Sequence, residues 1–217
     1  GDVSWGYNPS EPMAPESAYG TPEDLKAFVD GAHARGMGVV VDVVMNHWGP
    51  SDLPMWCIDG NCLGAGGVYF YTDWRAVTPW GNTRPDFGRN EVKNFLVANA
   101  TYWLQEFHVD GLRVDAVASM LYLDYSREEG QWLPNQYGGR ENLDAVAFVR
   151  RFNELVYGEY PGVITVAEES TAWGAVSRPT YVGGLGFGFK WDMGWMNDTL
   201  TYISHDPVHR KYHHNDL

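Results

Sequence analysis

The apolar residues of the chain follow two different patterns, each in its own set of segments. Three long segments place their apolar residues at helical spacing, and they cover residues 21–36, 91–107 and 141–157. Three shorter segments are nearly continuous apolar runs, typical of strands buried on both faces, and they cover residues 39–44, 109–117 and 162–167. A weaker strand is predicted over residues 187–193 and a short helix over 195–203. The segments therefore predict strands and helices in alternation.

This alternation predicts an α/β fold, because strand–helix–strand units build parallel sheets through right-handed crossovers. The first helix has a clear start at Thr21 and Pro22, which suit the N-cap and the first helical position. Between residues 48 and 90 the chain is rich in Gly, Pro and aromatic residues and has no sustained period. We expect a long loop excursion there, and such loops are usually functional.

Composition excludes several classes of protein. The 217 residues are 44% hydrophobic and 20% charged, which is ordinary for a globular chain and excludes intrinsic disorder. Apolar runs are all shorter than the roughly 18 residues that span a membrane. The net charge of −13 repels phosphate backbones and anionic lipids, so we expect no nucleic acid and no membrane as partners. Ten Trp and thirteen Tyr either pack the core or provide flat surfaces for a neutral ligand such as a sugar.

Polar side chains follow the predicted strands where parallel sheets place their reactive groups. Arg113 and Asp115 are two residues apart and share a face of their strand, and an adjacent arginine favours the ionised form of a carboxylate. Glu168 follows the next strand. Neighbouring strands lie about 4.7–4.9 Å apart, close to the roughly 5–5.5 Å between the carboxyl groups of retaining glycosidases. The spacing thus permits a nucleophile and a general acid/base, or alternatively an ion-pair network that only fills the sheet edge.

Several longer strings carry a family resemblance. GLRVDAV at 111–117 and AEEST at 167–171 resemble the α-amylase superfamily, glycoside hydrolase family 13. Within it, ASMLYLDY at 118–125, NQYGGREN at 135–142 and KYHHN at 211–215 resemble the glycogen branching enzymes. The resemblance implies that residues 1–217 are a partial catalytic domain, the middle strands and helices of a (β/α)8 TIM barrel.

The resemblance also implies an activity and its residues. A retaining enzyme would cleave an α-1,4-glucan such as amylose or glycogen and transfer the chain to a glucose 6-hydroxyl. Asp115 would be the nucleophile and Glu168 the acid/base. The implied substrate-binding residues are Tyr7, Asp42, His47 and Arg113. Tyr7 would stack on the attacked glucose, and His47 would donate to one of its hydroxyls. We expect no cofactor, no metal and a cytoplasmic location.

Other features keep two alternatives open. DVVMNH at 42–47 and YFYTDWR at 69–75 are more similar to other members of the superfamily, so α-amylase-type hydrolysis is an alternative. In many amylases the residue matching Asn46 is a calcium ligand. The family also needs a third carboxylate, an Asp after a His. His205–Asp206 matches these two residue types, but the pair follows a predicted helix and not a strand.

We therefore expect the third acid and the first barrel strand to lie outside residues 1–217, and the chain alone to be weakly active or inactive. A glucan-binding piece without catalysis is the alternative from another class. Cys57 and Cys62 are close enough in sequence to close a small loop as a disulfide.

Overall fold

The computed structural model describes residues 4–49, 53–60 and 67–216 and contains one parallel sheet. Its strands are β1 (Val40–Val43), β2 (Gly111–Val114), β3 (Ile164–Ala167) and β4 (Phe189–Lys190), and their order in the sheet equals their order in the sequence. All three pairings are parallel. The predicted alternation and the predicted neighbourhood of the second and third strands are confirmed.

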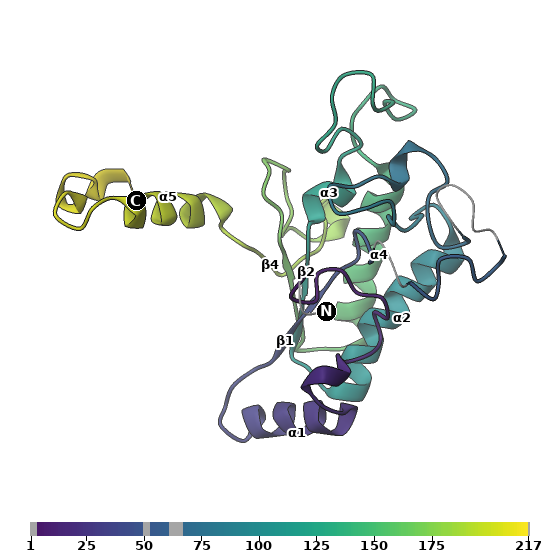
Figure 1. Ribbon diagram of the computed structural model, residues 1–217, viewed down its shortest axis with the longest axis horizontal. Coiled ribbons are helices and arrows are strands. Elements are labelled where there is room, and N and C mark those ends of the chain that lie inside the picture. The colour runs from purple at the N-terminus through teal and green to yellow at the C-terminus, as the bar shows by residue number, and fades with distance from the viewer. Residues whose placement is uncertain (1–3, 50–52, 61–66, 217) are drawn as a thin grey trace.

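Helices connect these strands. They are α1 (Pro22–His33), α2 (Asn90–Phe107), α3 (Val117–Leu121), α4 (Leu143–Glu159) and α5 (Met193–Ser204). Short 3-10 turns also occur, among them η2 (Trp74–Ala76). Figure 1 shows α2 and α4 packed together beside the sheet and α3 above the carboxyl end of β2. This arrangement leaves the carboxyl edge of the strands open to polar side chains.

The residues at the start of α1 and of β2 explain why these two elements begin where they do. Thr21 and Asp24 form a reciprocal capping box at the start of α1, which satisfies backbone N–H groups that the helix leaves free. Gly111 begins β2 where a side chain has no room, because a Cβ there would lie 2.6 Å from Ile164 Cγ1 and 2.9 Å from the Ile164 carbonyl oxygen. The close approach of β2 and β3 therefore requires glycine at this position.

The described residues of the loop excursion form turns such as η2 and single bridges, and they are not a loose surface loop. Trp48, Phe70 and Phe87 from this segment are completely buried and belong to the same apolar core as the helices behind the sheet. Aromatic packing thus fixes these described parts of the excursion. The excursion contributes residues to two cavities described below, one of which lies at the carboxyl edge of the sheet.

Three predicted elements differ in extent. The strand predicted to reach Val117 ends at Val114, because Ala116 adopts a left-handed conformation with φ of +50° and α3 begins directly after it. The last predicted strand shrinks to the two residues of β4, both exposed. The helix predicted from 195 begins at Met193 because the Asp192 carboxylate accepts a hydrogen bond from the Trp195 amide and caps it.

The C-terminal region extends away from the sheet (Figure 1). None of the residues of α5 is buried. His205 ends this helix, so His205 and Asp206 form a helix-end pair as predicted. Of the proposed disulfide pair, Cys62 lies outside the described residues. None of the helices formed by the described residues is long and apolar enough to cross a membrane.

Candidate active site

The side chains singled out from the sequence gather at the carboxyl edge of the sheet. Asp42 on β1 is in register with Arg113 on β2, while Asp115 and Glu168 directly follow β2 and β3. A cavity of about 510 Å³, here called the reaction cavity, is lined by five of the six predicted residues, namely Tyr7, His47, Arg113, Asp115 and Glu168. Asp42 does not line it but contacts two residues that do.

Arg113 is the centre of this arrangement. Its Nη1 lies 2.8 Å from Asp115 Oδ1 and 2.6 Å from Asp42 Oδ1, and its Nη2 lies 3.2 Å from Glu168 Oε2. One buried guanidinium thus bridges three carboxylates that come from three adjacent strands. The ion-pair network considered from the sequence exists, but it forms the wall of an open cavity instead of filling the sheet edge.

Asp42 and Tyr7 support the network from one side. The Tyr7 hydroxyl donates to Asp42 Oδ2 at 2.7 Å. This hydrogen bond to the carboxylate, together with burial, raises the pKa of Tyr7 to about 12. Tyr7 therefore stays a neutral phenol at the mouth of the cavity, and its ring lies 5.7 Å from the Arg113 guanidinium carbon.

His47 is neutral and both of its ring nitrogens are engaged. Burial lowers its pKa to about 4. The Tyr7 carbonyl can only accept a hydrogen bond, so the proton lies on His47 Nε2, which is 2.8 Å from that oxygen. The other nitrogen, Nδ1, lies 3.3 Å from the Asn46 amide nitrogen, which can donate to it. In this arrangement the N–H of His47 is directed at the backbone of residue 7.

The pKa of Asp115 is set by effects of opposite sign. Burial raises its pKa, the Arg113 guanidinium lowers it, and the charges of Glu168 and Asp42 raise it further, with a result of about 6. The sequence predicted the effect of the arginine, but burial outweighs it. Asp115 is therefore ionised at neutral pH and takes up a proton in mildly acidic solution.

A strained backbone position holds Glu168 beside Asp115. Ala116 adopts its left-handed conformation between the two elements, at a cost of roughly 1–2 kcal/mol for a residue with a Cβ. In this conformation the Ala116 amide donates to Glu168 Oε2 at 2.7 Å, and the Val117 amide donates to the Glu168 carbonyl. The turn after β2 thus fixes both the side chain and the backbone of the residue after β3.

Two aromatic residues at the site were not predicted as part of it. Trp80 from the loop excursion stacks on His47, with ring centroids 4.8 Å apart and planes 13° from parallel. Trp191 follows β4, and its ring centroid lies 4.4 Å from the Arg113 guanidinium carbon. Its position just after a parallel strand was the available signal, since that rule already selected Asp115 and Glu168.

Asn46 follows β1 beside His47. Its side-chain oxygen is buried without a hydrogen-bond partner. The described residues contain no group of three or more His, Cys, Asp or Glu side chains that could hold a metal ion.

Comparisons with known proteins agree with this geometry. The family model "Alpha amylase, catalytic domain" matches residues 2–56. The 1,4-alpha-glucan branching enzyme GlgB of Corynebacterium diphtheriae is 58% identical over 99% of this chain. The GlgB of Rhodospirillum rubrum is 56% identical over 100% of this chain. Along its whole length the chain is therefore similar to proteins of the α-amylase superfamily.

A solved structure supports the predicted fold class. The crystal structure of a putative α-amylase from Salmonella typhimurium matches 95% of this chain with a TM-score of 0.66 and 26% identity. The parallel sheet and its helices are thus part of a (β/α)8 barrel. The chain spans 29% of the length of each of the two branching enzymes and 31% of the matched amylase chain.

Proposed function

We propose that this chain is part of a 1,4-α-glucan branching enzyme that acts by retaining glycosyl transfer. The observation that carries the proposal is the pairing of Asp115 and Glu168 on one guanidinium at the wall of the same cavity. Its support from the comparisons is the similarity to branching enzymes along the whole chain, the two catalytic candidates included.

In the first step Asp115 attacks the anomeric carbon of an α-1,4-linked glucose. The bond to the leaving oxygen breaks, Glu168 donates its proton to that oxygen, and a covalent glycosyl ester forms on Asp115. Arg113 keeps Asp115 ionised against the effect of burial and fixes the direction of its attacking oxygen. In this proposal the two carboxyl groups have different roles within one hydrogen-bonded cluster, Asp115 as nucleophile and Glu168 as general acid.

In the second step a glucose 6-hydroxyl on an acceptor chain attacks the ester. Glu168, now ionised, removes the hydroxyl proton, the new α-1,6 bond forms, and Asp115 leaves as a carboxylate. The Ala116 amide donates to Glu168 Oε2 and so orients the carboxyl group that performs this step. Water in place of the sugar hydroxyl would give hydrolysis.

The remaining predicted residues bind the attacked glucose in this proposal. Tyr7 offers a neutral aromatic face beside the network, and the adjacent His47 with its stacked Trp80 adds a further part of the lining. Asp42 acts on the site through Tyr7 and Arg113.

The proposal is tested by trapping the covalent intermediate. A Glu168→Gln variant is incubated with α-maltotriosyl fluoride, whose leaving group needs no acid, and the digested protein is examined by mass spectrometry. We expect one maltotriosyl unit on the peptide that contains Asp115, and no label in a variant that also carries Asp115→Asn. Because labelling needs only one turnover, it is measurable even in a slow enzyme.

The alternatives give different results. Incubation of the unmodified chain with amylose separates transfer from hydrolysis, since transfer creates α-1,6 branches and hydrolysis creates reducing ends in excess. Binding of maltoheptaose without any covalent label would indicate a glucan-binding piece. Label on another residue, or no binding at all, would refute the proposal.

Three further expectations stay predictions that rest on the same proposal. The substrate is an α-1,4-glucan such as amylose or glycogen, nucleic acids and membranes are not partners, and the location is cytoplasmic. Their support is the similarity to GlgB proteins and the net charge of −13.

A further inference from the structure

A second cavity, here called the side cavity, lies apart from the reaction cavity and has a volume of about 390 Å³. It is formed by η2 of the loop excursion, the segment 133–136 and the start of α4, and its lining includes Trp74, Arg75, Leu123, Leu133, Asn142 and Asp144. None of its lining residues lines the reaction cavity. Its volume falls within the roughly 300–1,000 Å³ of small-molecule sites.

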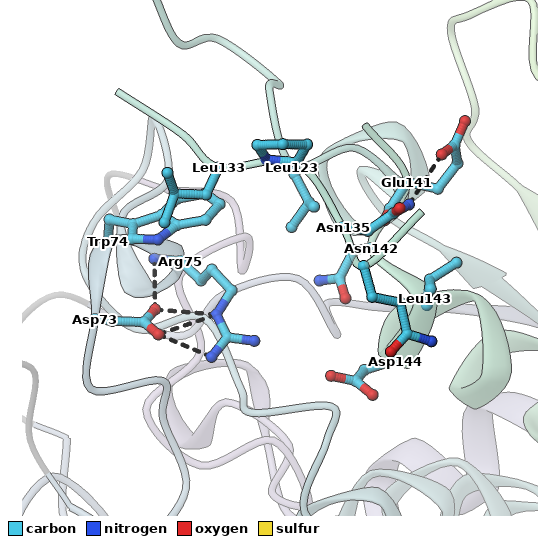
Figure 2. A pocket seen from close by; sticks show the side chains of 12 residues that line it. Asp73, Trp74, Arg75, Leu123, Leu133, Asn135, Glu141, Asn142, Leu143 and Asp144 are labelled. Carbon is cyan, nitrogen blue, oxygen red and sulfur yellow. Dashed lines mark hydrogen bonds and ion pairs between the residues drawn. The ribbon is translucent and has the colours of Figure 1, made fainter. Parts of the chain in front are cut away.

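Apolar and aromatic surfaces border one end of the side cavity. Figure 2 shows the Trp74 indole and Leu133 together at this end. The Arg127 guanidinium carbon lies 5.1 Å from the centroid of the Trp74 ring, and Arg127 also donates to the Trp74 carbonyl. The indole is therefore held in place from outside the cavity, as a rigid platform for a ligand requires.

Polar groups with opposite hydrogen-bonding roles face one another across the cavity. Arg75 binds Asp73 through Nε and Nη2, and its guanidinium carbon lies 4.2 Å from the Tyr71 ring centroid, so its position is fixed. Figure 2 shows the Arg75 guanidinium and the Asp144 carboxylate on different sides of the cavity. A ligand between them would meet a donor on one side and an acceptor on the other.

Asn142 adds a buried amide to the lining. It is 3% exposed, and its Oδ1 accepts from the Ala145 amide to cap α4. The amide also lies beside the buried Tyr71 hydroxyl, and this interaction lowers the pKa of Tyr71 against the larger effect of burial. Asn142 is therefore held in position at the wall of the side cavity.

The charges of the lining decide the class of ligand. Asp73, Glu141 and Asp144 bring three carboxylates, against the one guanidinium of Arg75. This balance repels phosphates and other anions. Sugar hydroxyls both donate and accept, so they satisfy carboxylates, guanidinium and amide together, while the apolar face of the ring rests on Trp74.

We propose that the side cavity binds one or two glucose units of an α-glucan as a second site, separate from the site of reaction; this rests on the proposed function. Both cavities take residues from the loop excursion and from the segment after α3, with Leu123 in one and Tyr125 in the other. A chain held in the side cavity is therefore anchored near the reacting chain, which raises the local concentration of glucan.

The experiment measures binding of maltoheptaose by calorimetry in a chain that carries Asp115→Asn, so that the ligand is not consumed. We expect two classes of site. Trp74→Ala, and separately Asp144→Asn, should weaken one class at least tenfold and leave the other unchanged, while Tyr7→Ala should act on the other class. Near-ultraviolet circular dichroism verifies that each variant keeps its tertiary packing.

Two control variants match these changes. Trp195→Ala removes an exposed indole on α5, and Glu23→Gln neutralises a first-turn carboxylate of α1, as Asp144→Asn does in α4. Neither should alter binding. A single class of site that Tyr7→Ala abolishes and Asp144→Asn leaves intact would overturn the second site while the proposed function stands. No binding to any variant would overturn both.

Discussion

Arg113 offers the sharpest test of the electrostatics of the site, through the variant Arg113→Gln. The guanidinium holds three carboxylates whose side chains are 37% (Asp42), 12% (Asp115) and 24% (Glu168) exposed. Removing one partner of a buried ion pair costs about 3–5 kcal/mol. Only Asp115 is well buried, and solvent screens the more exposed Asp42, so we expect a loss of about 3 kcal/mol in the free energy of unfolding at pH 7.5.

The cost should depend on pH in a defined direction. Without the arginine the pKa of Asp115 rises above its value of about 6, and each unit of that rise corresponds to about 1.4 kcal/mol. At pH 7.5 the variant must keep an unpaired charge or bind a proton, whereas at pH 5 Asp115 is mostly protonated in both proteins. The destabilisation should therefore shrink by at least about 1 kcal/mol between pH 7.5 and pH 5.

Urea unfolding followed by tryptophan fluorescence at the two pH values measures this difference. Arg178→Gln, which changes an exposed arginine, serves as the control and should cost less than about 0.5 kcal/mol at both. Equal destabilisation by Arg113→Gln at pH 7.5 and pH 5 would refute the assigned coupling between Arg113 and Asp115. A loss below about 0.5 kcal/mol at both would refute the central role of the guanidinium altogether.

Three further predictions concern stability. Because the folded-state pKa of His47 is lowered to about 4, its contribution is complete above pH 6.5 and is lost as pH falls toward 4, by up to about 3 kcal/mol; a pH series of urea midpoints that is no flatter in His47→Gln would contradict this. Gly111→Ala forces a Cβ against the Ile164 carbonyl and should cost about 1–3 kcal/mol in thermal unfolding, whereas Gly174→Ala, with open space around it, should cost almost nothing. Thr21→Ala removes half of a capping box and should cost about 1 kcal/mol; an unchanged urea midpoint would show that the cap is dispensable.

The sequence allowed the order of elements to be predicted because strands of parallel sheets form short continuous apolar runs and helices form longer periodic patterns. Residues 39–44 and 162–167 show the first pattern and residues 91–107 the second, and all three elements appear in the structure. The run at 39–44 predicts burial on both faces, but Val40 and Asp42 of β1 are exposed. Strand ends were less predictable. The run of apolar residues continues through Val117, but the left-handed turn at Ala116 ends β2 before it.

The chemistry that depends on distance from solvent could not be predicted from residue types. An arginine two residues before Asp115 indicates a lowered pKa, yet burial raises it, and burial depends on contacts from distant segments. The same holds for Trp80, which reaches His47 from 33 positions along the chain, within an excursion that has no periodicity to place it. Register and periodicity predict neighbours within the sheet, but they do not predict what lies above it.

The cluster at the carboxyl edge has an excess of negative charge, which bears on the proposed roles of its carboxyl groups. Three carboxylates surround one guanidinium, so a fully ionised cluster carries more negative than positive charge in a partly buried place. Burial and the neighbouring charges of Glu168 and Asp42 raise the pKa of Asp115 to about 6, although the Arg113 guanidinium lowers it. The proposed nucleophile must be ionised when it attacks the sugar. Arg113 therefore offsets the effect of burial so that Asp115 remains ionised at neutral pH, and its loss would move the protonation of Asp115 into the neutral pH range.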